Sequence, residues 1–177
     1  MTSTTTVAAA SLSMYQASVP VFTRTFANLS TILDKALADA TARGVDAREL
    51  LDGRLAPDML PLPRQIQLAS DTAKGCIARL AGRDVPSFAD TETTFAELQE
   101  RIVKTVAFMQ TVGPADIDGS ERRKISFKAG PYELNFVGQG YLLDFALPNF
   151  FFHVTTAYAI LRHKGAPLGK MDYLGKL

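Results

Sequence analysis

Cysteine is almost absent from this chain, whose single thiol belongs to Cys76. One cysteine cannot form an internal disulfide, so the disulfide-stapled secreted scaffolds are excluded and the composition fits a reducing cytoplasm. An excess of charge of one sign is also missing, because 19 Lys and Arg residues face 18 Asp and Glu residues. Without a basic stripe or an acidic tail, neither nucleic acid nor a membrane surface is an expected partner.

Long apolar runs are missing as well. Charged residues interrupt every apolar stretch before it reaches the roughly 20 residues of a membrane-spanning helix. The start of the chain, MTSTTTVAAASLS, has no basic segment of the kind found in signal peptides, and residues 1–12 are expected to form a disordered tail. Residues 13–177 are long enough for one domain with a sizeable core. We therefore expect a single cytoplasmic domain.

A helical repeat opens this domain. From Tyr15 onward, apolar residues recur at alternating intervals of four and three, as in helices that pack at about 20° to antiparallel neighbours. Pro20 is expected to kink this first helix or to break its first turn, and Gly44 is expected to end it.

A long link and a second helix follow. Residues 45–61 carry prolines and no period, and they leave room for a short helical turn at residues 47–51. Pro63 fits the first turn of a second helix, where its missing N–H costs little. That helix is predicted to run to about Ala81, with Gly82 as its stop.

A capping box opens the third predicted helix. The oxygen of Thr94 takes a free backbone N–H while Glu97 reaches back to the backbone of the cap. Two pairs with i,i+4 spacing, Glu97–Arg101 and Glu100–Lys104, are expected to mark a solvated face, each contributing about 0.2–0.5 kcal/mol.

The pattern changes to strict alternation at residues 122–137, on both sides of a Gly-Pro turn, which predicts a small β-hairpin. A fourth helix is predicted from near Gln139 to near Lys164. Four helices of similar length imply an all-α, antiparallel four-helix bundle with this hairpin between helices three and four. The link at residues 45–61 is long enough for a crossover connection.

Three stretches of the chain, together with the order of its predicted elements, resemble a family of domains of unknown function, number nineteen-ninety-three. The stretches are LAPDMLPLPRQIQLASDTAKG, DTETTFAELQERI and ALPNFFFHVTTAYAILRHKGAPLGKMDYLG. The resemblance spans residues 13–175. It implies a fold similar to the DinB/YfiT-like bundles, many of which are described as metal-dependent enzymes.

The DinB-like superfamily typically binds a divalent metal through three histidines, one on the second helix and two on the fourth, four residues apart. His153 matches the first histidine of that pair, but Ala157 stands at the partner position. The second predicted helix contains no histidine. Two of the three ligands are missing, so we expect no metal and no other cofactor, with His153 as a weak candidate ligand.

His153 follows three phenylalanines inside the apolar run of the fourth helix. It is either a residual metal ligand or general base, or a neutral core histidine bonded to a polar group of the second helix. The second interpretation is favoured, because a four-coordinate metal site needs ligands that this chain does not supply. The ligand pocket predicted around it comprises Gln67, Ser70, Asp71, Asn149, His153 and Thr156.

Asp71 shares a helical stripe with Gln67 and Lys74. If this stripe faces the bundle interior, Asp71 could orient His153 as a carboxylate–imidazole pair. If it faces solvent, Asp71 and Lys74 form only a weak surface pair. Both interpretations stay open at the level of sequence.

An outward-facing stripe of Phe151, Thr155 and Tyr158 lies on the side of the fourth helix opposite His153. Such a stripe predicts a homodimer interface, unless the hairpin covers it with Phe127 and Phe136.

Two functional hypotheses follow from these residues. The favoured one is a dimeric protein that binds a small ligand, or a cryptic relative of the DinB-like proteins, without an intact three-histidine site. The alternative is an enzyme with a divergent site that uses His153 with Asp71 as acid and base, or His153 as a residual metal ligand.

Overall fold

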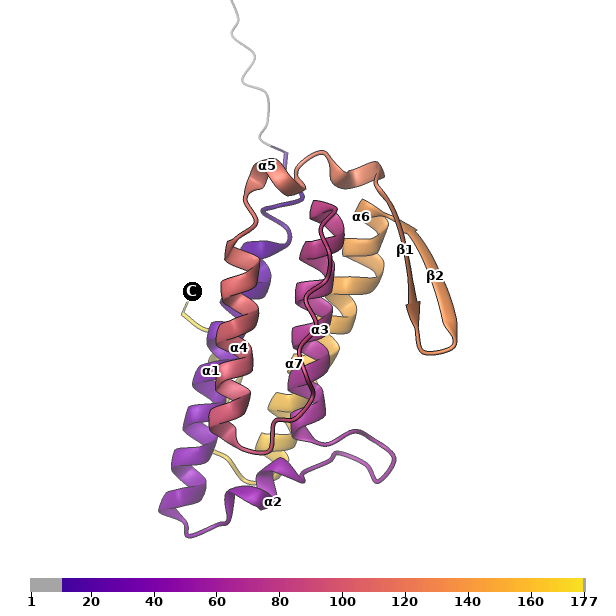
Figure 1. Ribbon diagram of the computed structural model, residues 1–177. Coiled ribbons are helices and arrows are strands. Elements are labelled where there is room, and N and C mark those ends of the chain that lie inside the picture. The colour runs from indigo at the N-terminus through magenta and orange to yellow at the C-terminus, as the bar shows by residue number, and fades with distance from the viewer. Residues whose placement is uncertain (1–10, 177) are drawn as a thin grey trace, which may run out of the picture.

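The computed structural model describes residues 11–176, so the predicted tail at residues 1–12 lies almost wholly outside the described residues. Four long helices lie side by side and form a bundle (Figure 1). They are α1 (Val19–Ala42), α3 (Leu62–Ala81), α4 (Phe95–Gln110) and α7 (Leu147–His163). The prediction of a four-helix bundle with a small β-hairpin is confirmed.

The short elements lie at the ends of the bundle and beside it. They are α2 (Ala47–Leu51), α5 (Pro114–Ile117), the 3₁₀ turn η1 (Ser120–Arg122), β1 (Lys124–Ala129), β2 (Tyr132–Val137), α6 (Gly138–Gly140), the π-helical segment η2 (Tyr141–Ala146) and α8 (Lys170–Leu174).

Local signals in the sequence account for most helix ends. Pro20 lies in the first turn of α1, which begins only at Val19 and is preceded by a separate turn. Gly44 and Gly82 follow α1 and α3 with φ of +66° and +67°, a left-handed conformation that only glycine adopts without strain. The capping box of Thr94 and Glu97 is formed at the start of α4.

The order of the helices around the bundle differs from a simple up-and-down arrangement. Both α1 and α3 contact α4 and α7, so α1 and α3 lie at opposite corners. Residues 83–94, which connect the end of α3 to the start of α4, return along the whole length of the bundle (Figure 1). The helices α3 and α4 therefore run in the same direction. Residues 83–94 are therefore the crossover connection of the bundle, and we call them the crossover segment. The link at residues 45–61 is not a crossover connection.

The β-hairpin leans on the start of the fourth helix. Its strands pair antiparallel from Lys124 opposite Val137 to Ala129 opposite Tyr132. The rings of Phe127 and Phe136 lie 5.7 and 5.4 Å from the ring of Phe145. The hairpin therefore packs at Phe145, six residues before the stripe at Phe151, and the idea that it covers that stripe is wrong.

The fourth predicted helix is continuous from α6 through η2 to α7, within one residue of both predicted ends. Its π-helical turns come just before Pro148, which has no N–H to donate and whose ring crowds the carbonyl of residue 144. Phe150 then enters the core, with ring centroids 4.7 Å from Phe22 and 5.1 Å from Phe26.

Cys76 lies on the buried side of α3 and is fully enclosed. Burial raises the pKa of this thiol far above its ordinary range, and the nearby cation of Arg79 offsets only part of the effect. The thiol is therefore unreactive in the folded protein.

Across residues 11–176, every helix is either too short or too polar to span a bilayer.

Candidate functional site

His153 is buried, with 9% of its surface exposed, as predicted. Its Nδ1 lies 2.8 Å from Oε1 of Gln65 on α3, an oxygen that can only accept, so Nδ1–H donates. Burial lowers the pKa of His153 below its ordinary value. The prediction of a polar partner on the second helix is confirmed, but the partner is Gln65 and not Asp71, Gln67 or Ser70, the residues expected from the sequence.

The structure divides the predicted ligand pocket between two sides of α3. On the side of α7, Nδ2 of Asn149 donates to Oγ1 of Thr72 at 2.7 Å, and Oγ1 of Thr156 donates to a carbonyl of its own helix. Ser70 faces α4, where its hydroxyl lies 2.7 Å from Oγ1 of Thr105. The six predicted residues therefore do not form one pocket.

Asp71 and Gln67 also face away from His153. Oδ1 of Asp71 lies 2.7 Å from Nζ of Lys74 and 2.8 Å from Nη2 of Arg101. Nε2 of Gln67 donates to Glu92 at 2.8 Å. The predicted acid–base pair of Asp71 with His153 is therefore wrong, because helix α3 turns their side chains toward different neighbours.

A three-histidine metal site does not fit these residues. The α3 side chain that meets His153 is an amide, Gln65, and Ala157 offers no ligand atom. The part of the chain that the structure describes contains no group of three His, Cys, Asp or Glu residues placed to hold a metal ion. No step of chemistry through a metal can be derived from this site.

The purified protein is expected to carry far less than one tightly bound transition-metal ion per chain. The reason is the missing second and third histidine ligands around His153. Elemental analysis after purification without chelators measures the content. One ion per chain that disappears in His153→Ala would contradict the expectation.

Replacing His153 by Ala is expected to lower the free energy of unfolding by about 1–3 kcal/mol, because the buried Oε1 of Gln65 loses its hydrogen-bond donor. His153→Asn, which retains a donor and an acceptor, should cost less. Urea unfolding of both variants measures the difference. Two variants as stable as the wild type would show that the histidine contributes nothing to the fold.

The same histidine gives the protein a pH dependence of known sign. The unfolded chain protonates His153 near its ordinary pKa of about 6.5, whereas the folded protein resists protonation. The unfolded state then binds more protons, so stability falls as the pH drops below about 6.5. His153→Asn should show a flatter dependence in this range.

Arg101 of α4 lies at the centre of a cluster of charged side chains on the other side of α3, and only 3% of its surface is exposed. Its Nη2 contacts Asp71 on α3, and its Nη1 lies 2.9 Å from Oε1 of Glu92 and 3.0 Å from Oδ1 of Asp90. The carbonyl of Ala89 also accepts from Nη1 at 3.0 Å. One guanidinium thus joins α4 to α3 and to the crossover segment.

Glu92 and Arg101 stay ionised at neutral pH. Burial alone would raise the pKa of Glu92, but hydrogen bonds from Arg101 and Gln67 outweigh it and hold that pKa below its ordinary value. Burial likewise opposes the charge of Arg101, yet Glu92, Asp71 and Asp90 together raise its pKa. The pair of Glu92 and Arg101 therefore provides fixed charges rather than a proton donor near neutrality.

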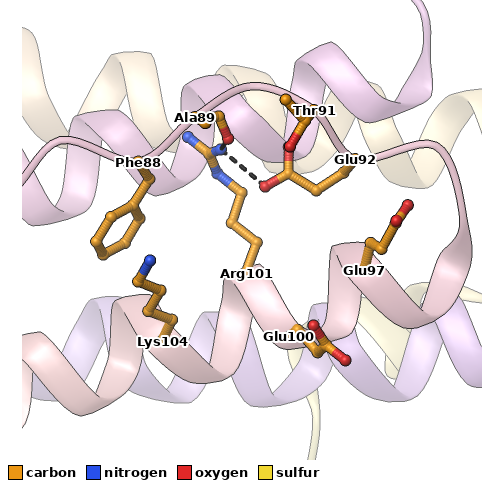
Figure 2. Close-up of a pocket in the computed structure, with 8 residues that line it drawn as sticks. All are labelled: Phe88, Ala89, Thr91, Glu92, Glu97, Glu100, Arg101 and Lys104. Atoms are coloured by element: carbon orange, nitrogen blue, oxygen red, sulfur yellow. Dashed lines mark hydrogen bonds and ion pairs between the residues drawn. The ribbon is translucent and has the colours of Figure 1, made fainter.

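A cleft of about 320 Å³ opens beside Arg101, between the crossover segment and α4 (Figure 2). We call it the crossover cleft; it is lined by Phe88, Ala89, Thr91, Glu92, Glu97, Glu100, Arg101 and Lys104.

Neither i,i+4 pair predicted on α4 is formed among the described residues. Arg101 turns inward to its three carboxylates, and Oε2 of Glu97 instead accepts the backbone N–H groups of Thr93 and Thr94 at 2.7 and 2.9 Å. Nζ of Lys104 lies 4.3 Å from the ring centroid of Phe88. The four charged side chains of these two pairs were expected on a solvated face of α4, but they line the crossover cleft instead.

Sequence reasoning missed the crossover cleft because it treated Arg101 as half of a surface pair. One signal was available: Arg101 is three residues after Leu98 and four before Thr105, both of which belong to the inner face of the helix.

The outward face of α7 carries the residues predicted to form a dimer interface. Phe151 and Thr155 line a shallow apolar groove with Leu55. Next to it, Oγ1 of Thr155 lies 3.0 Å from the hydroxyl of Tyr173 on α8, whose ring also meets Tyr158. The short helix α8 therefore covers part of this face and leaves the groove open.

Comparisons with known proteins agree with this architecture. A crystal structure described as a DinB family member protein from Shewanella denitrificans is 40% identical to the chain and covers 92% of both chains, with a TM-score of 0.85. No protein with a curated description matches. The family model "Domain of unknown function (DUF1993)" matches residues 14–174. Since it spans nearly all of the described domain, the chain belongs to this DinB-like DUF1993 family.

Proposed function

We propose that this protein binds a small polar ligand in the crossover cleft and does so without a histidine-held metal. The observation that carries the proposal is the arrangement of Glu100 and Lys104, which line one cleft at i,i+4 spacing yet form no ion pair. Side chains of opposite charge with this spacing are close enough to pair along the helix surface. Here the charges of Glu100 and Lys104 remain available to a ligand.

Binding accounts for the geometry better than catalysis does. A general acid or base works best with a pKa near the operating pH. In the cleft, hydrogen bonds hold the pKa of Glu92 and Glu97 below the ordinary range, so both stay ionised. The enzyme hypothesis also required His153 and Asp71 to meet, and they bond to Gln65 and Arg101 instead.

A thermal-shift screen with amino acids, amines, dicarboxylates and sugar phosphates tests the proposal. A ligand at one hundred times its Kd raises the free energy of unfolding by about 2.7 kcal/mol, which is about 5–10 °C in Tm for a domain of this size. For ligands that carry an anionic group, the stabilisation should persist in Lys164→Met, at the C-terminal cap of α7, and shrink in Lys104→Met. No stabilisation by any class, or equal stabilisation of both variants by these ligands, would overturn the proposal.

The protein acts as a homodimer, with the outward face of α7 as its interface. Phe152, which borders the apolar groove on this face, is 56% exposed. Exposed aromatic residues next to an apolar groove are typical of association surfaces.

Tyr158→Glu is expected to shift the protein from dimer to monomer, because it would bury a carboxylate against an aromatic surface. Light scattering at micromolar concentration measures the mass. Tyr132→Glu on the hairpin, where the ring is exposed away from α7, is the matched control and should leave the dimer intact. A wild-type monomer would contradict this interface.

A further inference from the structure

The charged residues of the crossover cleft lie on one face of α4 and are sorted by sign. Glu97, Glu100 and Lys104 are spaced i, i+3 and i+7, which places them along one side of the helix. Glu97 and Glu100 gather at one end of the cleft, and Lys104 lies at the other end beside Phe88 (Figure 2). The cleft therefore has an acidic end and a basic end.

The acidic end has acceptor capacity that the chain does not use. The hydrogen bonds of Glu97 are made by Oε2, which leaves Oε1 without a donor among the described residues. Glu100 accepts no hydrogen bond from any residue between 11 and 176. An ammonium group carries three N–H donors and matches this set of carboxylate oxygens.

The basic end has a cation without a counter-charge. Nζ of Lys104 rests on the ring of Phe88 and has no carboxylate within 4.0 Å in the described chain. Deeper in the wall, Nε of Arg101 is buried and lacks a hydrogen-bond partner in the same residues. The uncompensated charge of Lys104 favours an anionic end of a ligand at this side of the cleft.

The distance between the two ends selects the shape of the ligand. A helix rises 1.5 Å per residue, so about 6 Å separates the backbone of Glu100 from that of Lys104, and about 10 Å separates Glu97 from Lys104. An α-amino acid with an uncharged side chain carries its ammonium and carboxylate on the same carbon and cannot reach both ends. A molecule with its amine and carboxylate at opposite ends of a short alkyl chain can do so. Phe88 and Ala89 supply the apolar wall for that chain.

From this arrangement we infer that the crossover cleft binds an ω-amino carboxylate, with its ammonium group at Glu97 and Glu100 and its carboxylate at Lys104. The inference rests on the proposed function and adds the chemical class of its ligand.

Calorimetric titration with four probes tests the inference. They are δ-aminovalerate, its isomer norvaline, and the single-ended analogues n-pentylamine and valerate. The wild type should bind δ-aminovalerate at least tenfold more tightly than each of the other three. Equal affinity for δ-aminovalerate and norvaline, or for δ-aminovalerate and either single-ended probe, would overturn the inference.

Two variants assign the ends. In Glu100→Gln the affinity for δ-aminovalerate should fall at least fivefold while that for valerate stays unchanged. In Lys104→Met it should fall at least fivefold while that for n-pentylamine stays unchanged. Loss of all binding in both variants, with melting temperatures unchanged, would contradict the two-ended arrangement. If the screen finds a ligand of another class in the cleft, the inference fails and the proposed function stands; if no class binds, both fail.

Discussion

Replacing Arg101 by methionine is expected to lower the free energy of unfolding by about 3 kcal/mol. Removing one partner of a buried ion pair usually costs about 3–5 kcal/mol, because the remaining charges lose their compensation. Here the low end applies, since Asp71 and Asp90 keep about a third of their side-chain surface in water, 37% and 35%. For a domain of this size the loss corresponds to a Tm decrease of about 6–12 °C.

Lys104→Met is the matched control for stability, because it removes the same charge from the same face of α4 at an exposed position. It should change the free energy of unfolding by less than about 0.5 kcal/mol. Urea unfolding of both variants decides the matter. An Arg101→Met protein as stable as Lys104→Met would mean that the crossover segment is held by other contacts.

Acid should weaken the same cluster. The pKa of Glu92 in the folded protein lies below its value of about 4.3 in the unfolded chain. The contribution of Glu92 to the free energy of unfolding is therefore fully present above that pH, and it is lost as the pH falls through the folded pKa. In Arg101→Met this part of the acid dependence should shrink, because the main hydrogen-bond donor to Glu92 is gone.

Gly138→Ala is expected to destabilise the fold by about 2–3 kcal/mol. A Cβ atom on Gly138 would lie 2.0 Å from the carbonyl oxygen of Ser120, which is backbone and cannot rotate away. Overpacking of this kind usually costs about 1–3 kcal/mol. The strain falls where β2 passes into α6, so the hairpin should loosen first.

Gly140→Ala, two residues later, is the control. Its Cβ would come no closer than 3.4 Å to any neighbour, the Oδ2 atom of Asp144, and alanine favours the helix. Amide hydrogen exchange in β1 and β2 distinguishes the two variants. Equal protection in both would mean that the turn at η1 moves aside at little cost.

Local signals predicted the elements well because each rests on chemistry within a few residues. The capping box at Thr94, the stop at Gly82 and the alternation around Gly130-Pro131 all appear in the structure. The path between helices was harder to predict, because the links at residues 45–61 and 83–94 are both long. Periodicity tells which face of a helix is buried, but not which neighbour covers it.

The same limit explains the outcome for the candidate site. Burial of His153 followed from its apolar surroundings, but its partner depended on the rotation of α3, which carries polar side chains toward both α7 and α4. Arg101 was missed because surface pairs at i,i+4 are common, and the carboxylates that bind it lie in an irregular segment or on another helix.

The enclosed thiol of Cys76 reports how often the helix bundle opens. A thiol reagent can reach this side chain only when the helices around α3 separate, so its labelling rate measures how often the bundle opens under native conditions. Because the sequence has no second cysteine, the signal comes from one position. If the ion pairs of Arg101 hold the whole bundle together, Arg101→Met should speed the labelling of Cys76. If they hold only the crossover segment, the labelling rate should stay unchanged.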